Sequence, residues 1–379
     1  MWCPLQRLLL DPQMQPARVG VAPEWTRADF VAQALRVAAR LRETRPRAVA
    51  LHFSDAARMA CAFLACAHEG VAMVLPPNLA ADNLVWACEQ ADVWMTDGHT
   101  PSLAREVAHA AQAAGAEAQA GRGNIEVWTL TDEAILVEEA LHGNLFAQTA
   151  QTAQTAQTAQ TAQTAEQRAP RSVSNADDLK GAGQVPAHLL NLDTEVWLKT
   201  SGSTGRPQII GKTVAQFQAE AEALAQCWSL ADEAPVDAIV GSVSPQHLYG
   251  LSFRVVLSLC AGWPIHRMQC VYPESLLAAA LPMRRSVWIC SPMLLDALGE
   301  DRVGPRLRGS VSRLVSSAGS LSAATSERLH RQLGILPDEI YGSTETGVIA
   351  HRQGSGPWQP LPSVQHGTDA EGALWVDSP

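Results

Sequence analysis

The sequence predicts an α/β protein in which mostly parallel strands are covered by helices on both faces. Three observations lead to this class. Hydrophobic residues make up 47% of the 379 residues and charged residues 17%, which suffices for a packed core and excludes a wholly disordered chain. Short apolar runs alternate with longer segments of helical spacing. The runs are apolar throughout, as in strands buried on both faces. The chain length indicates more than one lobe.

Residues 1–145 are expected to form an N-terminal α/β subdomain. Its first helix is expected over residues 29–41, because apolar residues recur there at helical spacing and Thr26 is suited to cap the free amides. The elements expected after it are a strand at 48–53, a helix at 55–69 ended by Gly70, a strand at 71–75 stopped by Pro76 and Pro77, a helix at 84–90 and a strand at 93–96.

A low-complexity segment over residues 146–188 interrupts this pattern. Residues 147–164 are six tandem Ala-Gln-Thr triplets, and a period of three fits neither a helix nor a strand. The triplets have no large apolar side chain with which to offset their own ordering entropy. We therefore expect a disordered insertion in a surface loop, with a role in interactions as the alternative.

The α/β pattern resumes in a second subdomain, residues 189–379. The elements expected here are strands at 195–199, 236–240, 287–290, 311–317 and 339–341, and helices at 214–228 and 251–259. Each strand is again a short apolar run, which indicates a second helix-covered sheet.

Charge and cysteine usage narrow the function classes. There are 28 basic and 38 acidic residues, a net charge of -10, which argues against a general nucleic-acid binder. No apolar run approaches the roughly 18 residues of a membrane helix, so no membrane span is expected. The eight cysteines form no Cys-x-x-Cys pair, which predicts reduced thiols in a cytoplasmic protein.

The most informative stretch is a glycine loop that directly follows a predicted strand. It reads Thr200-Ser201-Gly202-Ser203-Thr204-Gly205-Arg206-Pro207-Gln208. Glycines let the backbone approach a ligand, and free amides and hydroxyls form a cradle for phosphate. An ordinary polar surface turn is the alternative. A Walker A loop is excluded, because five residues instead of four separate Gly205 from Gly211 and Pro207 removes an amide donor.

Four segments in order resemble signatures of the adenylate-forming ligases, the superfamily of acyl-CoA synthetases, peptide synthetase adenylation domains and luciferase. They are the glycine loop and residues 245–250, 316–321 and 340–347. The resemblance covers most of the chain apart from the triplets. It implies the large N-terminal domain of this superfamily, with two packed, mostly parallel, helix-flanked sheets.

Three shorter strings resemble one branch of the superfamily, the AMP-ligases of bacterial aryl polyene and xanthomonadin-type pigment clusters. They are residues 211–213, 247–251 and 343–353. This resemblance implies ATP-dependent activation of an aryl or acyl carboxylic acid as its acyl-adenylate. The acyl group would then pass to the thiol of coenzyme A or to the phosphopantetheine thiol of an acyl carrier protein.

The resemblance also implies a role for each site residue. The β- and γ-phosphates of ATP would lie against the glycine loop, at Thr200, Ser201, Gly202, Ser203, Thr204 and Gly205. Tyr341 would stack on adenine, Gly319 would allow its close approach, and Gly342 and Ser343 would also belong to the nucleotide site. The catalytic group would be Thr344 at the α-phosphate, Glu345 as the ligand of Mg²⁺, and His247 in the acid pocket.

Two departures from the family pattern put turnover in doubt. Gln208 stands where the family usually has a lysine, and Lys212 or Arg206 is the candidate to replace that cation. Residues 372–379 resemble the segment just before the family's ribose-binding aspartate, so we expect the C-terminal cap domain with its catalytic lysine to be missing. A weakly active or inactive ligase domain is therefore expected. The alternative is a degenerate nucleotide-binding module.

Overall fold

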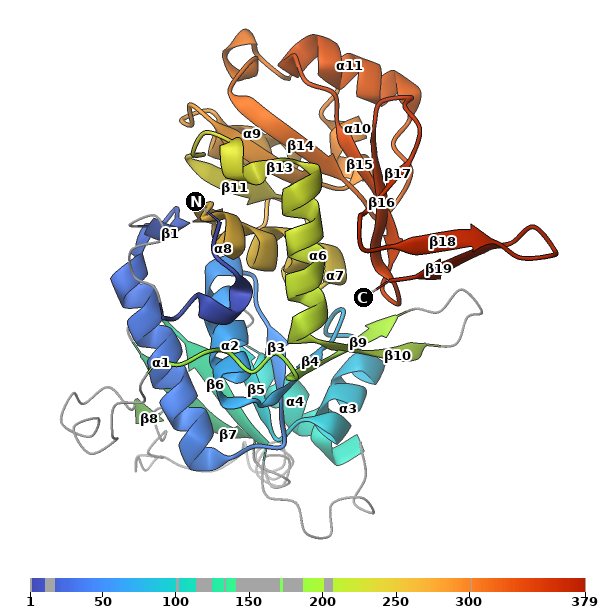
Figure 1. Ribbon diagram of the computed structural model, residues 1–379. Helices are drawn as coiled ribbons and strands as arrows, with labels where there is room; N and C mark the ends of the chain where they lie inside the picture. The colour runs from blue at the N-terminus through green and yellow to red at the C-terminus, as the bar shows by residue number, and fades with distance from the viewer. Residues whose placement is uncertain are drawn as a thin grey trace, which may run out of the picture.

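Two large sheets with helices between them form the body of the protein, and a small β-hairpin projects from it (Figure 1). The computed structural model describes residues 2–10, 18–99, 102–113, 125–132, 134–140, 171–172, 187–200, 207–300 and 302–378. The Ala-Gln-Thr triplets and the tip of the glycine loop, residues 201–206, lie outside these ranges. The expected α/β class with helix-flanked, mostly parallel sheets is confirmed.

The first sheet has the strand order β10-β9-β4-β3-β5-β6-β7-β8. Its five central strands, from β9 to β6, are parallel, and an antiparallel strand flanks them on each side. The strands are β3 (Ala48–His52), β4 (Ala72–Leu75), β5 (Val93–Thr96), β6 (Ile125–Leu130), β7 (Ile135–Ala140), β8 (Arg171–Ser172), β9 (Glu195–Thr200) and β10 (Gln208–Thr213).

The second sheet has the order β17-β16-β15-β14-β13-β11-β12-β1-β2 and is parallel from β15 to β1. Its strands are β1 (Arg18–Val21), β2 (Trp25–Thr26), β11 (Ala238–Gly241), β12 (Ile265–His266), β13 (Ser286–Cys290), β14 (Val311–Ser316), β15 (Asp338–Ser343), β16 (Gly347–Gln353) and β17 (Gln359–Pro360). The projecting hairpin consists of β18 (Gln365–Thr368) and β19 (Leu374–Asp377).

The two sheets exchange strands between the halves of the chain. β9 comes after the low-complexity segment, yet it pairs with β4 in the first sheet, where Met73 lies opposite Val196. Conversely, β1 joins the second sheet through β12, with Gly20 opposite Ile265. The sheets therefore do not follow the division at residues 145 and 189 that the sequence suggested.

The helices lie between the sheets and on their outer faces. They are α1 (Arg27–Thr44), α2 (Ala56–Glu69), α3 (Ala81–Gln90), α4 (Leu103–Ala113), α6 (Val214–Cys227), α7 (Leu248–Gly250), α8 (Ser258–Ala261), α9 (Pro273–Ala280), α10 (Pro292–Ala297) and α11 (Ala323–Leu333). The short 3₁₀ turns in the described part of the chain are η1 (Leu5–Arg7), η3 (Leu230–Asp232) and η5 (Pro305–Leu307). The helix expected over 251–259 begins as a π-helix, η4 (Leu251–Leu257), and continues as α8.

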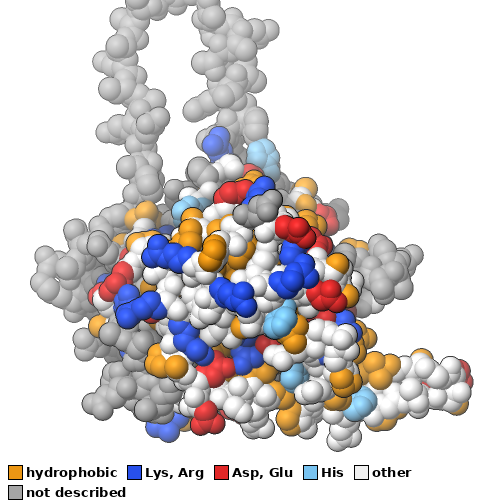
Figure 2. Space-filling view, turned by 90° about the horizontal axis from the view of Figure 1, so that it is seen from above, with side chains coloured by type: hydrophobic (Ala, Val, Ile, Leu, Met, Phe, Trp, Pro, Cys, Tyr) orange, Lys and Arg blue, Asp and Glu red, His pale blue; other side chains and the backbone are white. Residues whose placement is uncertain are grey.

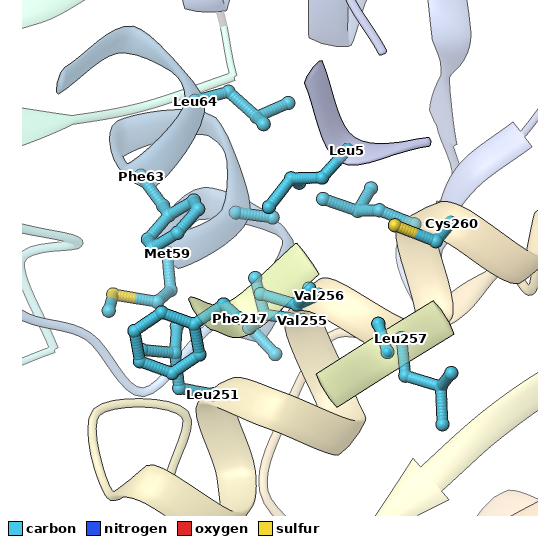
Figure 3. Packing of buried hydrophobic residues seen from close by; sticks show 14 of the residues in the cluster. Leu5, Met59, Phe63, Leu64, Phe217, Leu251, Val255, Val256, Leu257 and Cys260 are labelled. Atoms are coloured by element: carbon cyan, nitrogen blue, oxygen red, sulfur yellow. The ribbon is translucent and has the colours of Figure 1, made fainter. Parts of the chain in front are cut away.

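The central core lies where α2, α6 and η4 meet between the sheets (Figure 3). Phe63 of α2 and Phe217 of α6 pack edge to face, with ring centroids 6.2 Å apart. Leu251 and Val255 of η4 complete this cluster. All four side chains are almost fully buried, so this cluster fixes the position of α6 relative to both sheets.

The upper face of the molecule carries charges of both signs (Figure 2), and the protein has no disulfide. Figure 2 shows basic and acidic side chains interspersed over the upper face. All eight cysteines are free, and burial raises the pKa of the Cys88 thiol to about 12. Among the described helices, none combines the length and apolar character needed to span a bilayer.

The Thr26→Ala variant is expected to lose about 0.5–2 kcal/mol of unfolding free energy, because Thr26 caps α1 as predicted. The Thr26 hydroxyl accepts a hydrogen bond from the amide of Asp29 at 3.2 Å. Urea denaturation measures the change. Thr26→Ser keeps the hydroxyl and serves as the control. An equal loss in both variants would show that the cap contributes nothing.

Candidate functional site

The candidate site lies at the carboxyl ends of the parallel strands of the second sheet. β13 and β14 end side by side, with Cys290 opposite Ser316, and Ser316 lies opposite Glu339 of β15. In open α/β sheets, ligands bind outside the carboxyl ends of the strands. Three of the four segments that resemble family signatures leave or approach this edge of the sheet.

The turn over residues 343–348 is tightly held by its own backbone and hydroxyl groups. The amide of Ser343 donates to Thr346 Oγ1, and the amide of Thr346 donates to Ser343 Oγ, both at 3.2 Å. A Cβ at Gly342 would lie 2.1 Å from the carbonyl oxygen of Gly347, and Gly347 has φ +70°. Glycine is therefore required at both positions to close the turn between β15 and β16.

Thr344 and Glu345 occupy the tip of this turn. Glu345 is exposed, and within the described part of the chain no hydrogen bond or ion pair engages its carboxylate. The Thr344 hydroxyl likewise has no hydrogen-bond partner among the described residues. Both groups are thus available to a ligand, and a free carboxylate is the kind of oxygen ligand that Mg²⁺ prefers.

An aromatic surface lies beside the turn. The Tyr341 ring is 47% exposed and lies 5.6 Å from the ring of Trp358, centroid to centroid. The Arg352 guanidinium stacks on Trp358 at 4.4 Å and donates two hydrogen bonds to the carboxylate of Glu339, at 3.0 and 3.2 Å. Tyr341 therefore presents a supported, solvent-accessible face on which a flat ring can stack.

The end of β14 lies beside the end of β15. Ala318 adopts a left-handed conformation with φ 67°, which is unusual for a residue with a side chain. Around Gly319, a Cβ would meet only the Pro292 side chain, at 3.6 Å. The Ser317 hydroxyl donates to the carbonyl oxygen of Ile340 at 3.3 Å and ties this segment to β15. The Gly319 backbone is thus open to a ligand at the position that the resemblance implies.

His247 lies just before α7 and is held near the strand ends by its neighbour Tyr249. The Tyr249 hydroxyl donates to the carbonyl oxygens of Cys290 and Val315, at 3.3 and 3.0 Å. Loss of hydration lowers the pKa of His247. It also lowers the pKa of His52, at the end of β3, and a charged His247 lowers that pKa further. The two imidazoles are therefore close enough to interact electrostatically.

The glycine loop joins β9 and β10, an antiparallel pair in which Gln208 lies opposite Thr200. Thr200 Oγ1 is buried and has no hydrogen-bond partner among the described residues. Such an unpaired buried hydroxyl is suited to a ligand oxygen. The loop residues Ser201, Gly202, Ser203, Thr204 and Gly205 lie outside the described ranges, and their roles stay predictions.

Lys212, the cation proposed to compensate for Gln208, lies on β10 and is only 5% exposed. Its Nζ donates to the carbonyl oxygen of Glu345 at 3.2 Å. Burial lowers the Lys212 pKa, and the nearby carboxylates of Glu220 and Glu345 oppose that shift. Lys212 therefore contacts the turn over residues 343–348, and it also lies on the strand that follows the glycine loop.

The structure thus brings most of the described candidate residues to one edge of the second sheet. Gly319, Tyr341, Gly342, Ser343, Thr344 and Glu345 lie on two neighbouring strand ends. Sequence reasoning missed Glu220, Trp358 and Arg352. Their contacts join residues 6–128 positions apart, and no periodicity or spacing in the sequence indicates such pairs.

The residues present fit a magnesium nucleotide. An exposed aromatic face, an open glycine backbone, an unpaired buried hydroxyl and a free carboxylate are the groups that adenine, the phosphates and Mg²⁺ require. Tyr341 and Gly319 would hold the base, Thr200 and Thr344 the phosphates, and Glu345 the metal ion.

Comparison with known proteins gives one consistent result. A family model described as AMP-binding enzyme matches residues 12–370. A 4-coumarate–CoA ligase from Rhodobacter capsulatus is 34% identical over 162 residues, which is 42% of this chain and 39% of that protein.

Solved structures show the same fold at lower identity. MatB from Rhodopseudomonas palustris matches with a TM-score of 0.67 and 19% identity, over 99% of this chain and 68% of that one. A benzoate CoA ligase from Burkholderia xenovorans LB400 matches with a TM-score of 0.71 and 17% identity, over 100% and 72%. O-succinylbenzoate CoA synthetase from Bacillus subtilis, in complex with AMP, matches with 0.68 and 17%, over 99% and 68%.

Proposed function

Because the chain belongs to the AMP-binding enzyme family, we propose that it binds ATP and activates a carboxylic acid as its acyl-adenylate. The observation that carries the proposal is the edge of the second sheet, where the open Gly319 backbone, the Tyr341 ring and the free tip of the turn at Glu345 come together. These groups match the base, phosphate and metal parts of a magnesium nucleotide.

In the proposed first step, a carboxylate oxygen of the acid attacks the α-phosphorus of ATP. The bond from that phosphorus to the bridging oxygen breaks, and pyrophosphate leaves. In the second step, a thiolate attacks the acyl carbon and AMP leaves. Both reactants of the first step are anionic, so catalysis consists of positioning and charge neutralisation rather than of a protein nucleophile.

The residues of this chain supply that positioning. Thr344 would donate its hydroxyl to the α-phosphate, and Glu345 would hold the Mg²⁺ that neutralises phosphate charge. His247 would line the acid pocket. Because its pKa is lowered, this imidazole is neutral at pH 7 and can donate or accept a hydrogen bond without adding a charge.

We propose an aryl or acyl acid as the substrate, with coenzyme A or a carrier-protein thiol as the acceptor. The resemblance to AMP-ligases of aryl polyene and xanthomonadin-type clusters supports this substrate class. Two relatives named above are ligases of coumarate and benzoate, which are aromatic acids. The competing function is nucleotide binding without turnover, which the exposed Gln208 in place of the loop lysine favours.

Two measurements separate these functions. Calorimetric titration with ATP and Mg²⁺ detects the binding site, and acid-dependent exchange of labelled pyrophosphate into ATP detects adenylation across a panel of aryl and fatty acids. Binding together with exchange supports the ligase. Binding without exchange for every acid supports the nucleotide-binding module. No binding at millimolar ATP by the folded chain would refute both.

The Tyr341→Ala variant is expected to bind ATP more weakly by about 1–3 kcal/mol, the usual contribution of stacking a base on an aromatic ring. Tyr341→Phe keeps the ring and should bind nearly as tightly as the unaltered chain. Calorimetry measures both affinities. If Phe weakens binding as much as Ala, the hydroxyl rather than the ring carries the interaction.

A further inference from the structure

Lys212 is a buried cation bound to the backbone of the turn over residues 343–348. It lies on β10, four residues after Gln208, and Gln208 pairs with Thr200 at the base of the glycine loop. At the other end of this short strand, Lys212 Nζ donates to the carbonyl oxygen of Glu345 at 3.2 Å. One rigid strand therefore contacts both motifs that the proposed function assigns to the nucleotide.

Glu220 binds the same turn beside Lys212, and both side chains approach Gly347. Glu220 lies on α6, and its Oε2 accepts a hydrogen bond of 2.7 Å from the amide of Val348. A Cβ at Gly347 would lie 2.4 Å from Glu220 Oε2 and 3.8 Å from Lys212 Nζ. The missing side chain at Gly347 thus gives both charged groups room to reach the backbone.

The two contacts bracket the tip of the turn. Lys212 holds the carbonyl oxygen of residue 345 and Glu220 holds the amide of residue 348, while the side chains of Thr344 and Glu345 remain free. Each is a charge-assisted hydrogen bond to the backbone, which is stronger than a neutral one. α6 is itself fixed by the Phe63–Phe217 contact in the central core.

We propose that Lys212 and Glu220 are positioning residues that hold residues 343–348 in register with the glycine-loop hairpin. The inference rests on the proposed function for its consequence, because the turn presents Thr344 and Glu345 to the phosphates. Lys212 then acts through the backbone of Glu345. In this role it does not substitute for the family lysine at position 208, because its ammonium already lies against the turn.

The physical reason for such a device is the geometry of the site. β9 and β10 belong to the first sheet, whereas β15 and β16 belong to the second. The phosphate groups would therefore lie between two sheets that have no strand in common. Contacts that join β10 and α6 to the β15–β16 turn would keep a fixed distance between the glycine loop and that turn.

Hydrogen exchange tests the clamp, meaning the contacts of Lys212 and Glu220 with the backbone of residues 343–348, without any ligand. In Lys212→Met, the amides of residues 343–348 should exchange about tenfold faster or more, because a hydrogen bond to a charged group contributes about 1.5–3 kcal/mol. In Glu220→Gln they should exchange about fivefold faster, because the glutamine oxygen still accepts from the Val348 amide but carries no charge. Glu222→Gln, on the same helix, is the matched control and should leave these amides unchanged. Exchange in the turn that is unchanged in both test variants, or equally raised in the control, would overturn the proposal.

The double variant Lys212→Met/Glu220→Gln guards against simple misfolding, because it leaves no uncompensated buried carboxylate. Its exchange in the turn should equal that of Lys212→Met, since the two residues act on one element and their effects do not add. Strictly additive effects in a folded double variant would show two independent structural contacts and overturn the coupling.

ATP titration with Mg²⁺ then links the clamp to the site. Loss of the clamp should weaken ATP binding about tenfold and leave the KM for the acid unchanged. If the unaltered chain binds no ATP, the proposed function fails while the exchange result still decides the clamp. If the turn loosens but ATP affinity stays constant, the positioning role is refuted.

Discussion

The Glu345→Gln variant is expected to form acyl-adenylate about 10²–10³-fold more slowly than the unaltered chain. Losing one preorganised charge-stabilising group costs about this much in rate. The Glu345 carboxylate lies at the tip of the 343–348 turn, exposed and without a hydrogen bond among the described residues, so glutamine fits in its place without breaking one. The substitution removes the charge that would hold Mg²⁺, a charge that also favours the protonated form of Lys212.

Acid-dependent exchange of pyrophosphate into ATP measures this rate across a range of Mg²⁺ concentrations. Glu327→Gln is the matched control, because Glu327 is an exposed glutamate of α11 and lies away from the turn. The control should keep the rate and magnesium dependence of the unaltered chain. A Glu345→Gln variant with both properties unchanged would show that Glu345 does not hold the metal ion.

The Arg267→Met variant is expected to unfold about 3–5 kcal/mol more easily. Arg267 follows β12 of the second sheet, and its side chain is 1% exposed. Its guanidinium donates to Asp55, the N-cap of α2, and to Asp132, which follows β6 of the first sheet, both at 2.7 Å. Removing one partner of a buried ion pair leaves an uncompensated charge, which is strongly destabilising.

Urea denaturation measures the free energy of unfolding. Arg302→Ala is the control, because its ion pair with Glu274 has both side chains more than half exposed and contributes at most about 1 kcal/mol. The double variant Arg267→Met/Asp55→Asn should recover part of the loss, since the buried carboxylate is also removed. A loss below about 1 kcal/mol in Arg267→Met would show that Asp55 is satisfied by Arg58 and the α2 amides alone.

Local chemistry made several features readable from the sequence. The N-cap at Thr26 and the stop at Gly70 depend on a few neighbouring residues, and the structure has both, with Gly70 at φ 69°. Buried strands were found wherever an apolar run of four or more residues lay between turn residues. The antiparallel strand β10 was missed, because its mostly exposed or polar residues give no such run.

The candidate site likewise has features that could be predicted from the sequence and features that could not. Residues 200–208 and 340–347 indicated phosphate and nucleotide chemistry from the sequence alone. Their glycines, hydroxyls and carboxylate are close together in the chain, so the pattern can be recognised without knowing the fold. The support of Tyr341 by Trp358 and Arg352 was invisible, since it depends on how β15, β16 and the chain before β17 are arranged in space.

The sequence by itself determined the α/β class, many of the helices and buried strands in both halves, and the nucleotide chemistry expected of the motifs. Only the tertiary structure decided that β9 and β10 complete the first sheet and that Arg267 joins the two sheets. It also decided that Lys212 and Glu220 reach one turn, which lies 133 and 128 residues further along the chain. The reason is physical. Propensities, caps and glycine turns act over a few residues, whereas strand pairing and buried charges depend on which distant segments the packed core brings into contact.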